Sequence, residues 1–269
     1  MKRKASLALL ALATCLVGLA AAAPAIAITD GTRDTVHTNV GLVRFTTADG
    51  RFRCSGTLIS PTVVLTAGHC TEGPATNVYV SFDTDLALDP LAPNITPAEK
   101  AARAAHYITG TAHPDPGWTG KLSLSKQHDQ GVVVLDAPAS TKWAIEPAPL
   151  PPVGYLDKNQ GKLKNATFTL VGYGVDIGAK KTQIVIPERR STTSYLKNVQ
   201  SEVVVFQIND QDSKAGGGSC FGDSGGAVFV DGYVLGDASY VNSFSCNATG
   251  SYQRDDTRYS RDFLNEFLG

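Results

Sequence analysis

Most apolar residues of this chain lie in short segments rich in Val, Ile, Thr and aromatic residues. Each segment is bounded by Gly, Pro, Asn or Asp, the residues that commonly end strands and form turns. This pattern predicts an all-β protein, built as a barrel or a sandwich. The expected strands are Val40–Phe45, Thr57–Thr66, Asn77–Phe82, Gly131–Leu135, Thr167–Val171, Glu202–Ile208, Ala227–Val230 and Tyr233–Leu235.

Two segments are predicted to be helical. Thr96–Glu99 has the pattern of a capping box with Pro97 at the first helical position, and it opens a short helix that runs to about Ala105. The last residues, Tyr259 to Leu268, place four apolar side chains on one helical face. These side chains are Phe263, Leu264, Phe267 and Leu268.

Three further segments are expected to lie outside the regular structure. Asp83–Trp118 is rich in Pro, Ala and Thr, and Asp176–Thr193 carries two pairs of basic residues, so we interpret both as surface insertions. Pro147–Pro152 is interpreted as the connection between two halves of the chain.

The first 27 residues have the layout of a secretory signal peptide. Basic residues at positions 2–4 precede an Ala- and Leu-rich run, and small residues follow at alternating positions. Signal peptidase could cut after Ala27 or after Ala25. A membrane anchor is the alternative, but the apolar run is barely long enough to span a bilayer. The sequence therefore predicts a secreted, extracellular protein.

Removal of residues 1–27 leaves 242 of the 269 residues, enough for one large β domain or two small ones. It also leaves 21 basic residues against 25 acidic ones, a net charge of about −4, which argues against nucleic-acid binding. Four cysteines remain in this exported segment, so disulfides are expected. Closeness in sequence favours Cys54–Cys70 and Cys220–Cys246 among the three possible pairings.

Three short motifs carry candidate chemistry. Ser224 lies in Gly222–Gly226 (GDSGG), where glycines can expose the hydroxyl and let backbone N–H groups converge, as an acyl-transfer nucleophile requires. His69 follows an apolar strand within TAGHC, and Asp129 precedes the strand Gly131–Leu135. Taken singly, each motif has an ordinary structural explanation: a turn, a structural or metal-binding histidine, and a turn cap.

Together, the order His69, Asp129, Ser224 resembles that of the chymotrypsin-like serine proteases. The strongest points of resemblance are TAGHC and CFGDSGG, and the similarity covers nearly all of residues 28–269. It implies two six-stranded antiparallel β-barrels, roughly residues 28–145 and 153–256, followed by a C-terminal α-helix over 257–269.

The resemblance also implies a role for each matching residue. Ser224 would attack the peptide carbonyl, His69 would transfer the proton, and Asp129 would orient His69. The N–H groups of Gly222 and Ser224 would form the oxyanion hole. The implied substrate pocket comprises Gly218, Ser219, Ser239, Tyr240, Val241 and Gly250.

Substrate preference follows from two of these positions. In the family, an acidic residue at the place of Gly218 selects Arg or Lys, so this uncharged position disfavours a basic substrate side chain. Val241 stands where the family usually has Gly and should narrow the pocket. We expect a small or medium apolar residue before the scissile bond. A basic preference, with Asp237, Asp255 or Asp256 supplying the charge, is the alternative.

The resemblance also gives the N-terminal sequence a role. In this family, a new N-terminal ammonium pairs with the acid beside the nucleophile, which here would join Ile28 to Asp223. A signal-peptidase cut after Ala27 would expose Ile28 directly. The sequence therefore predicts activation by export itself, with no separate zymogen stage.

The leading hypothesis is a secreted serine endopeptidase whose partners are protein or peptide substrates and proteinaceous inhibitors. A catalytically inactive protease fold that only binds is the competing hypothesis. A zinc module is poorly supported, because the cysteines lack close paired spacing. We expect a monomer without metal or cofactor that binds neither nucleic acid nor, once the leader is removed, a membrane.

Overall fold

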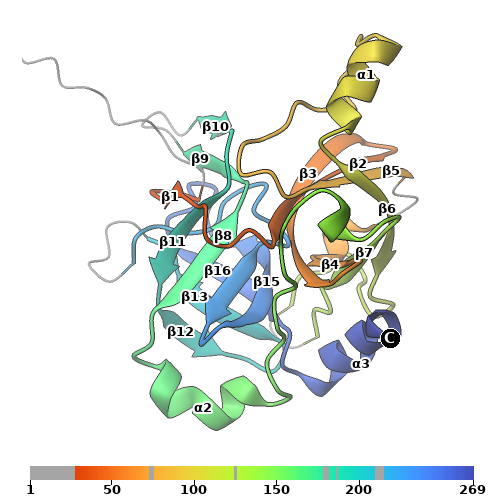
Figure 1. The fold of residues 1–269 in the computed structure, drawn as a ribbon. Helices are drawn as coiled ribbons and strands as arrows, with labels where there is room; N and C mark the ends of the chain where they lie inside the picture. The colour runs from red at the N-terminus through yellow and green to blue at the C-terminus, as the bar shows by residue number, and fades with distance from the viewer. Residues whose placement is uncertain (1–27, 73–75, 124–125, 178–181, 186, 210–214) are drawn as a thin grey trace, which may run out of the picture.

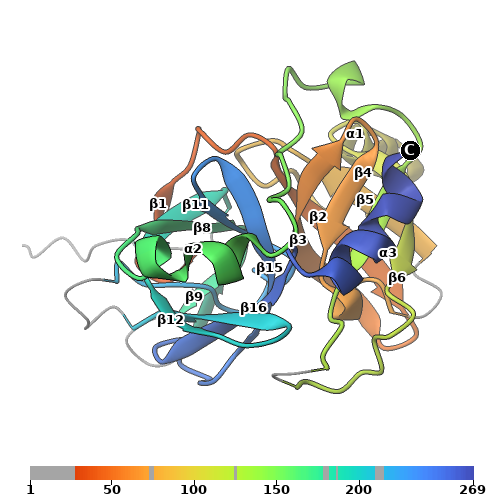
Figure 2. The same cartoon turned by 90° about the horizontal axis from the view of Figure 1, so that it is seen from below.

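The computed structural model describes residues 28–72, 76–123, 126–177, 182–185, 187–209 and 215–269. The expected signal peptide lies outside these residues. The described chain forms two β bodies that stand side by side, with three α-helices at their margins (Figures 1 and 2). Within the described residues, no helix is long and apolar enough to cross a bilayer.

The first body is a closed six-stranded barrel with the strand order β2-β3-β4-β7-β6-β5. Its core is filled by β-branched and aromatic side chains that alternate with outward-facing residues. The predicted strand Thr57–Thr66 is two strands, because the chain turns at Pro61. The strands are β2 (Val40–Thr47), β3 (Gly50–Ser60), β4 (Val63–Thr66), β5 (Thr76–Ser81), β6 (Ile108–Pro114) and β7 (Gly131–Leu135).

The second body is an eight-stranded sheet with the order β1-β11-β8-β14-β15-β16-β13-β12. The predicted fold class is confirmed, with one closed barrel and, in place of a second six-stranded barrel, this half-barrel sheet. A two-stranded ribbon of β9 (Val175–Ile177) and β10 (Gln183–Val185) lies apart. The eight strands are β1 (Thr32–Arg33), β8 (Phe168–Gly172), β11 (Arg190–Ser194), β12 (Leu196–Val199), β13 (Val203–Gln207), β14 (Ala227–Val230), β15 (Tyr233–Val241) and β16 (Thr249–Arg254).

Both predicted helices are present. In α1 (Pro97–Ala104), the Thr96 hydroxyl accepts from the Glu99 N–H while the Glu99 carboxylate accepts from the Thr96 N–H, which is the expected capping box. The C-terminal helix α3 (Arg258–Leu268) buries Phe263 and Leu264 in a cluster that also contains side chains of β2, β4 and β7. The last helix of the chain thus packs on the first barrel (Figure 2).

Several elements were not expected from the sequence. Helix α2 (Tyr155–Leu163) follows the Pro147–Pro152 connection and covers the lower edge of the second sheet (Figure 1). The two segments interpreted as surface insertions also contain regular structure. Asp83–Trp118 includes α1 and β6, and Asp176–Thr193 includes β10 and most of β11.

Candidate active site

His69 lies at the end of strand β4, in a short 3₁₀ helix, η1 (Gly68–Cys70). Its Nδ1 lies 2.9 Å from Asp129 Oδ2, and its backbone N–H donates to Asp129 Oδ1 at 2.8 Å. Because an ionised carboxylate only accepts hydrogen bonds, Nδ1 carries the proton and Nε2 is left as the basic nitrogen. Asp129, at the start of β7, is completely buried.

The second body supports Asp129 from the opposite side. The hydroxyl of Ser239, on β15, donates to Asp129 Oδ2 at 2.5 Å, and Gln127 Nε2 donates to the Ser239 oxygen at 2.6 Å. The carboxylate therefore receives donors from both β bodies. This arrangement fixes its direction toward His69, and with it the imidazole tautomer.

Ser224 lies in a tight turn between Cys220 and β14. Gly222 has φ of +91° and Gly225 has φ of +77°, which glycine adopts readily and a side chain would strain. A Cβ at Gly225 would also lie 2.1 Å from Thr66 Oγ1, so the first barrel leaves no room for one. The turn is attached to that barrel, because the Ser55 N–H donates to the Ser224 carbonyl at 2.7 Å.

The implied oxyanion donors, the N–H groups of Gly222 and Ser224, flank Asp223 in this turn. Within the described residues, neither N–H donates to another protein group. Neither N–H group therefore has an acceptor in the described part of the chain that would compete with a ligand.

His69 and Ser224 line one cavity of about 250 Å³. Four residues of the implied substrate pocket also line it, namely Ser219, Ser239, Tyr240 and Val241. Three others complete the wall without having been expected: Cys220, Phe221 and Ala238. The lining is almost entirely apolar or hydroxyl-bearing, and it carries no charged side chain apart from His69 when protonated.

Gly218 and Gly250 lie behind this lining. A Cβ at Gly218 would lie 2.1 Å from Ile208 Cβ, and a Cβ at Gly250 would lie 2.9 Å from Ser219 Oγ. The space next to Gly218 is thus filled by Ile208. A charged side chain would not fit there without displacing Ile208.

Three buried acids near β16 do not reach the cavity. Asp256 pairs with Arg254 Nε at 2.8 Å, and Gln130 Nε2 donates to Asp255 at 2.7 Å. Both oxygens of Asp237 are buried without a well-aligned donor among the described residues. Burial, followed by the charges of Asp255 and Asp129, raises the pKa of Asp237 well above its ordinary value. None of the three acids lines the cavity.

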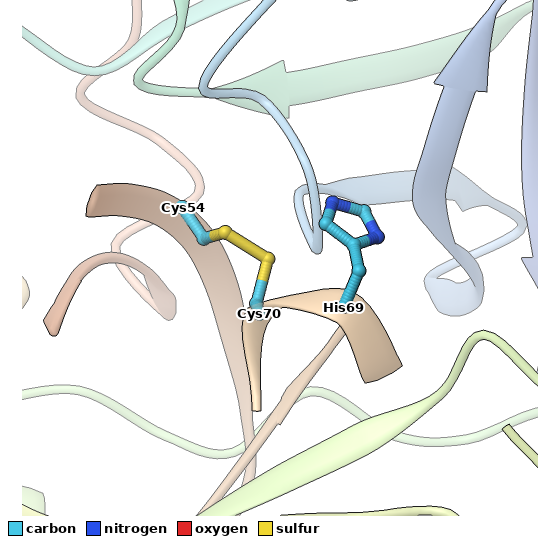
Figure 3. Close-up of side chains that lie close together, drawn as sticks. All are labelled: Cys54, His69 and Cys70. Carbon is cyan, nitrogen blue, oxygen red and sulfur yellow. A yellow bond between two sulfur atoms is a disulfide. The ribbon is translucent and has the colours of Figure 1, made fainter. Parts of the chain in front are cut away.

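Both predicted disulfides are present. Cys54–Cys70 joins β3 to η1, directly beside His69 (Figure 3), and Cys220–Cys246 joins the turn that carries Ser224 to the loop after β15. Among the described residues, Cys54, His69 and Cys70 form the one group of three or more His, Cys, Asp or Glu residues whose potential metal-binding atoms lie within 4.8 Å of one another. Since both sulfur atoms are held in the disulfide, they cannot act as thiolate ligands.

Asp223 and Ile28 are both buried, with Ile28 1% exposed. In the full chain, the Ile28 nitrogen is a peptide amide rather than an ammonium. Asp223 accepts from the N–H groups of Gly174 (2.7 Å) and Cys220 (2.9 Å). Burial nevertheless raises its pKa from 3.8 to about 7, so these two donors do not fully replace water.

The residue after Ile28 is hydrogen-bonded to Gly218, which directly precedes the cavity-lining Ser219. The Thr29 N–H donates to the Gly218 carbonyl at 2.8 Å, and the Gly218 N–H donates back to the Thr29 carbonyl at 3.2 Å. A Cβ at Gly217 would lie 1.7 Å from the Thr29 oxygen, so glycine is required for this approach. The start of the described chain is therefore hydrogen-bonded to the segment that leads to Cys220 and Ser224.

Comparison with known proteins gives a consistent result. The sequence profile of the Trypsin family matches residues 28–258. A trypsin from Phaedon cochleariae is 30% identical over 223 residues, which cover 79% of this chain and 78% of that protein. A chymotrypsin from the same organism is 27% identical, with 74% of this chain and 66% of that protein covered. A chymotrypsin-like elastase family member 3B from Macaca mulatta is 26% identical, with 77% of each covered.

Solved structures share the fold. A structure titled HL collagenase superimposes with a TM-score of 0.62 and 17% identity, covering 88% of this chain and 95% of the other. Human heparin binding protein gives a TM-score of 0.60 at 16% identity, with the same coverage. At these identities, the structural likeness speaks for the fold alone.

Proposed function

This chain belongs to the trypsin family of serine proteases, and from that premise we propose that it is an active endopeptidase with the triad His69, Asp129 and Ser224. The observation that carries the proposal is the arrangement around His69. Its Nδ1 is held by a buried carboxylate, which leaves Nε2 as a base in a cavity that Ser224 also lines.

In the proposed reaction, Ser224 Oγ bonds to the peptide carbonyl carbon while its proton passes to His69 Nε2. The oxyanion that forms accepts from the N–H groups of Gly222 and Ser224, each donor of this kind being worth about 2.7–4 kcal/mol of barrier. The C–N bond then breaks, and the proton on His69 passes to the leaving amine. Water, activated by His69 in turn, hydrolyses the acyl-enzyme and frees Ser224.

We propose a small or medium apolar residue on the acyl side of the bond. Support comes from the 250 Å³ cavity with its uncharged lining and from Ile208, which fills the space behind Gly218. Val241, half-buried in the cavity wall, limits the width available to a large side chain. A basic side chain would lose its hydration there without meeting a carboxylate.

We further propose that residues 1–27 direct export and that the cut after Ala27 creates the ammonium that pairs with Asp223. The raised pKa of Asp223 supports this proposal, since it marks a buried carboxylate that has only the more distant charge of Arg53 to offset its burial in the uncut chain. The proposed working form is an extracellular monomer that acts on proteins or peptides and is accessible to proteinaceous inhibitors.

Covalent labelling tests the proposed activity. The chain that begins at Ile28 is treated with a fluorophosphonate probe and, separately, with peptides that carry Ala, Val, Leu, Phe or Arg before the scissile bond. We expect one labelled serine, loss of label and hydrolysis in Ser224→Ala, and preferential cleavage after Ala, Val or Leu. A folded protein that neither reacts nor cleaves would instead support the inactive binding protein. Preferential cleavage after Arg would contradict the proposed specificity.

A further inference from the structure

A second cavity, of about 500 Å³, meets the first one at the proposed nucleophile. The two cavities share His69 and Ser224 among their lining residues and no others. If the first cavity takes the acyl side of a substrate, the second lies where the leaving-group side must pass. Beyond the shared pair, its walls come from the hairpin of β2 and β3 and from Glu72.

Arg53, on β3, is a half-buried wall residue of this second cavity. It also lies against the turn that carries the nucleophile, because a Cβ built on Gly222 would lie 3.2 Å from Arg53 Nε. The guanidinium is thus close to the turn of the proposed oxyanion donors. The Arg53 side chain borders both the second cavity and a neighbouring one that Gly222 lines.

The charge of Arg53 has no ion-pair partner within 4 Å among the described residues. Its two arginine neighbours differ in this respect, since Arg51 Nη1 lies 2.9 Å and Arg44 Nη1 3.6 Å from Asp89 Oδ2. Burial lowers the pKa of Arg53, the attraction of Asp223 opposes that shift, and the repulsion of Arg44 adds to it. The side chain is a cation that has lost part of its hydration without gaining a close carboxylate.

Resting on the proposed peptidase function, we propose that Arg53 is a specificity-determining residue that selects an acidic side chain on the leaving-group side of the scissile bond. A carboxylate is the one common peptide group that pairs with a guanidinium through two parallel hydrogen bonds. A bound substrate carboxylate would give Arg53 an ion-pair partner, as Asp89 does for Arg51 and Arg44.

Two acidic residues in the same cavity favour the opposite preference, for a basic side chain. Glu72 and Asp49 are both exposed wall residues and would attract a basic side chain instead. The carboxylate of Glu72, however, already accepts a hydrogen bond from Trp118 Nε1. Both acids are also open to water, where a charge interaction is weak. Arg53 is the more buried charge, so its preference should dominate.

The test uses internally quenched peptides with one fixed apolar segment before the scissile bond. At each of the first three positions after it, Asp is compared with Asn, Glu with Gln, and Lys with Gln. Each ratio of kcat/KM is taken within one protein variant, so general losses of activity cancel. At one position we expect about a tenfold ratio in favour of the acid, the discrimination given by one charge-assisted interaction of about 1.4 kcal/mol.

Arg53→Gln should bring that ratio to about one, and Arg53→Lys should keep part of it. Arg51→Gln is the matched control on the same strand and should leave the tenfold ratio unchanged. If Arg53→Gln does not fold, the wild-type ratio is measured at 0.05 M and 1 M NaCl, where it should fall severalfold.

Three results would overturn the inference while leaving the peptidase function intact. They are efficient cleavage with no acid preference at any of the three positions, a preference that survives in Arg53→Gln, and a preference for Lys. Failure to cleave every peptide would instead overturn the proposed function, and this inference with it.

Discussion

A single residue added before Ile28 should destabilise the protein in a pH-dependent way. We compare the chain that begins at Ile28, released from a cleavable fusion, with the same chain carrying Ala27. In the longer chain, the Ile28 nitrogen is an uncharged amide, and the pKa of Asp223 is raised from 3.8 to about 7. In the shorter chain, the ammonium can pair with the buried carboxylate.

The size of the effect follows from that shift. About three pKa units at 1.36 kcal/mol each correspond to about 4 kcal/mol of penalty for an ionised Asp223. Asp223 is 1% exposed, so solvent screening does not reduce this figure appreciably. Because the folded-state pKa is raised, the contribution to stability is present at low pH and is lost as pH rises from about 4 through 7.

We therefore expect the Ala27 chain to lose about 4 kcal/mol between pH 4 and pH 8 relative to the Ile28 chain. For a chain of this size, that corresponds to about 8–16 °C in Tm at pH 8. In the Ile28 chain, we expect pairing with Asp223 to favour the charged ammonium, so the contribution of the pair should persist at pH 8 and be lost only at higher pH. Thermal unfolding by circular dichroism at each pH measures the gap.

Asp223→Asn in both chains is the control, and it should make the gap independent of pH. Activity provides a second measurement, since Thr29 is hydrogen-bonded to Gly218, which directly precedes the cavity-lining Ser219. The Ala27 chain should have a lower kcat/KM for the apolar peptides at pH 8. Equal melting temperatures and equal activities across the pH range would refute the ion-pair reasoning.

Three further changes test other parts of the site. Ser239→Ala removes the 2.5 Å bond to Asp129 and the acceptor for Gln127, so urea unfolding should show a loss of about 1–3 kcal/mol and kcat should fall at least tenfold. Gly218→Asp should lower the free energy of unfolding by about 1–3 kcal/mol through overpacking, without creating cleavage after Arg. Ile208→Ala should relieve part of that loss. Because the pKa of Asp237 is raised in the folded protein, this carboxyl makes the wild-type fold less stable as pH rises above about 4. Asp237→Asn removes the carboxyl. The variant should therefore be more stable than wild type at pH 8 and not at pH 4. No such gain at pH 8 would show that burial and the charges of Asp255 and Asp129 do not raise the pKa of Asp237.

The strands that the sequence predicted are those whose apolar residues fill a core, such as β4 and β7. Strands β11 (RSTTS) and β16 (TGSYQR) could not be predicted in this way, because they bury polar side chains. In β16, Arg254 is buried by pairing with Asp256 and Asp157 rather than by hydrophobic contact. Hydrophobic periodicity cannot reveal a strand whose buried side chains are polar and form hydrogen bonds or ion pairs with residues distant in the sequence.

The same distinction applies to the site. The two disulfides and the motifs around His69 and Ser224 are local in sequence, so pattern alone could identify them. Phe221 also follows Cys220 directly, and its closeness to Ser224 was a signal that it lines the cavity. Arg53 offered no such signal. It is 171 positions from Ser224, as the sequence numbering shows, and only the folded hairpin brings it to the same cavity.

The candidate site depends on contacts between the two β bodies more than on either body alone. Asp129 belongs to the barrel, yet its supporting hydroxyl comes from Ser239 of the second sheet. Ser224 belongs to the second sheet, yet its carbonyl accepts from Ser55 of the barrel. Helix α3 fixes the same arrangement from outside, because it follows β16 but packs on the barrel. A small shift between the bodies would separate Asp129 from Ser239 and Ser224 from Ser55 while leaving each core intact. The geometry of the site is therefore more sensitive to this junction than the secondary structure is.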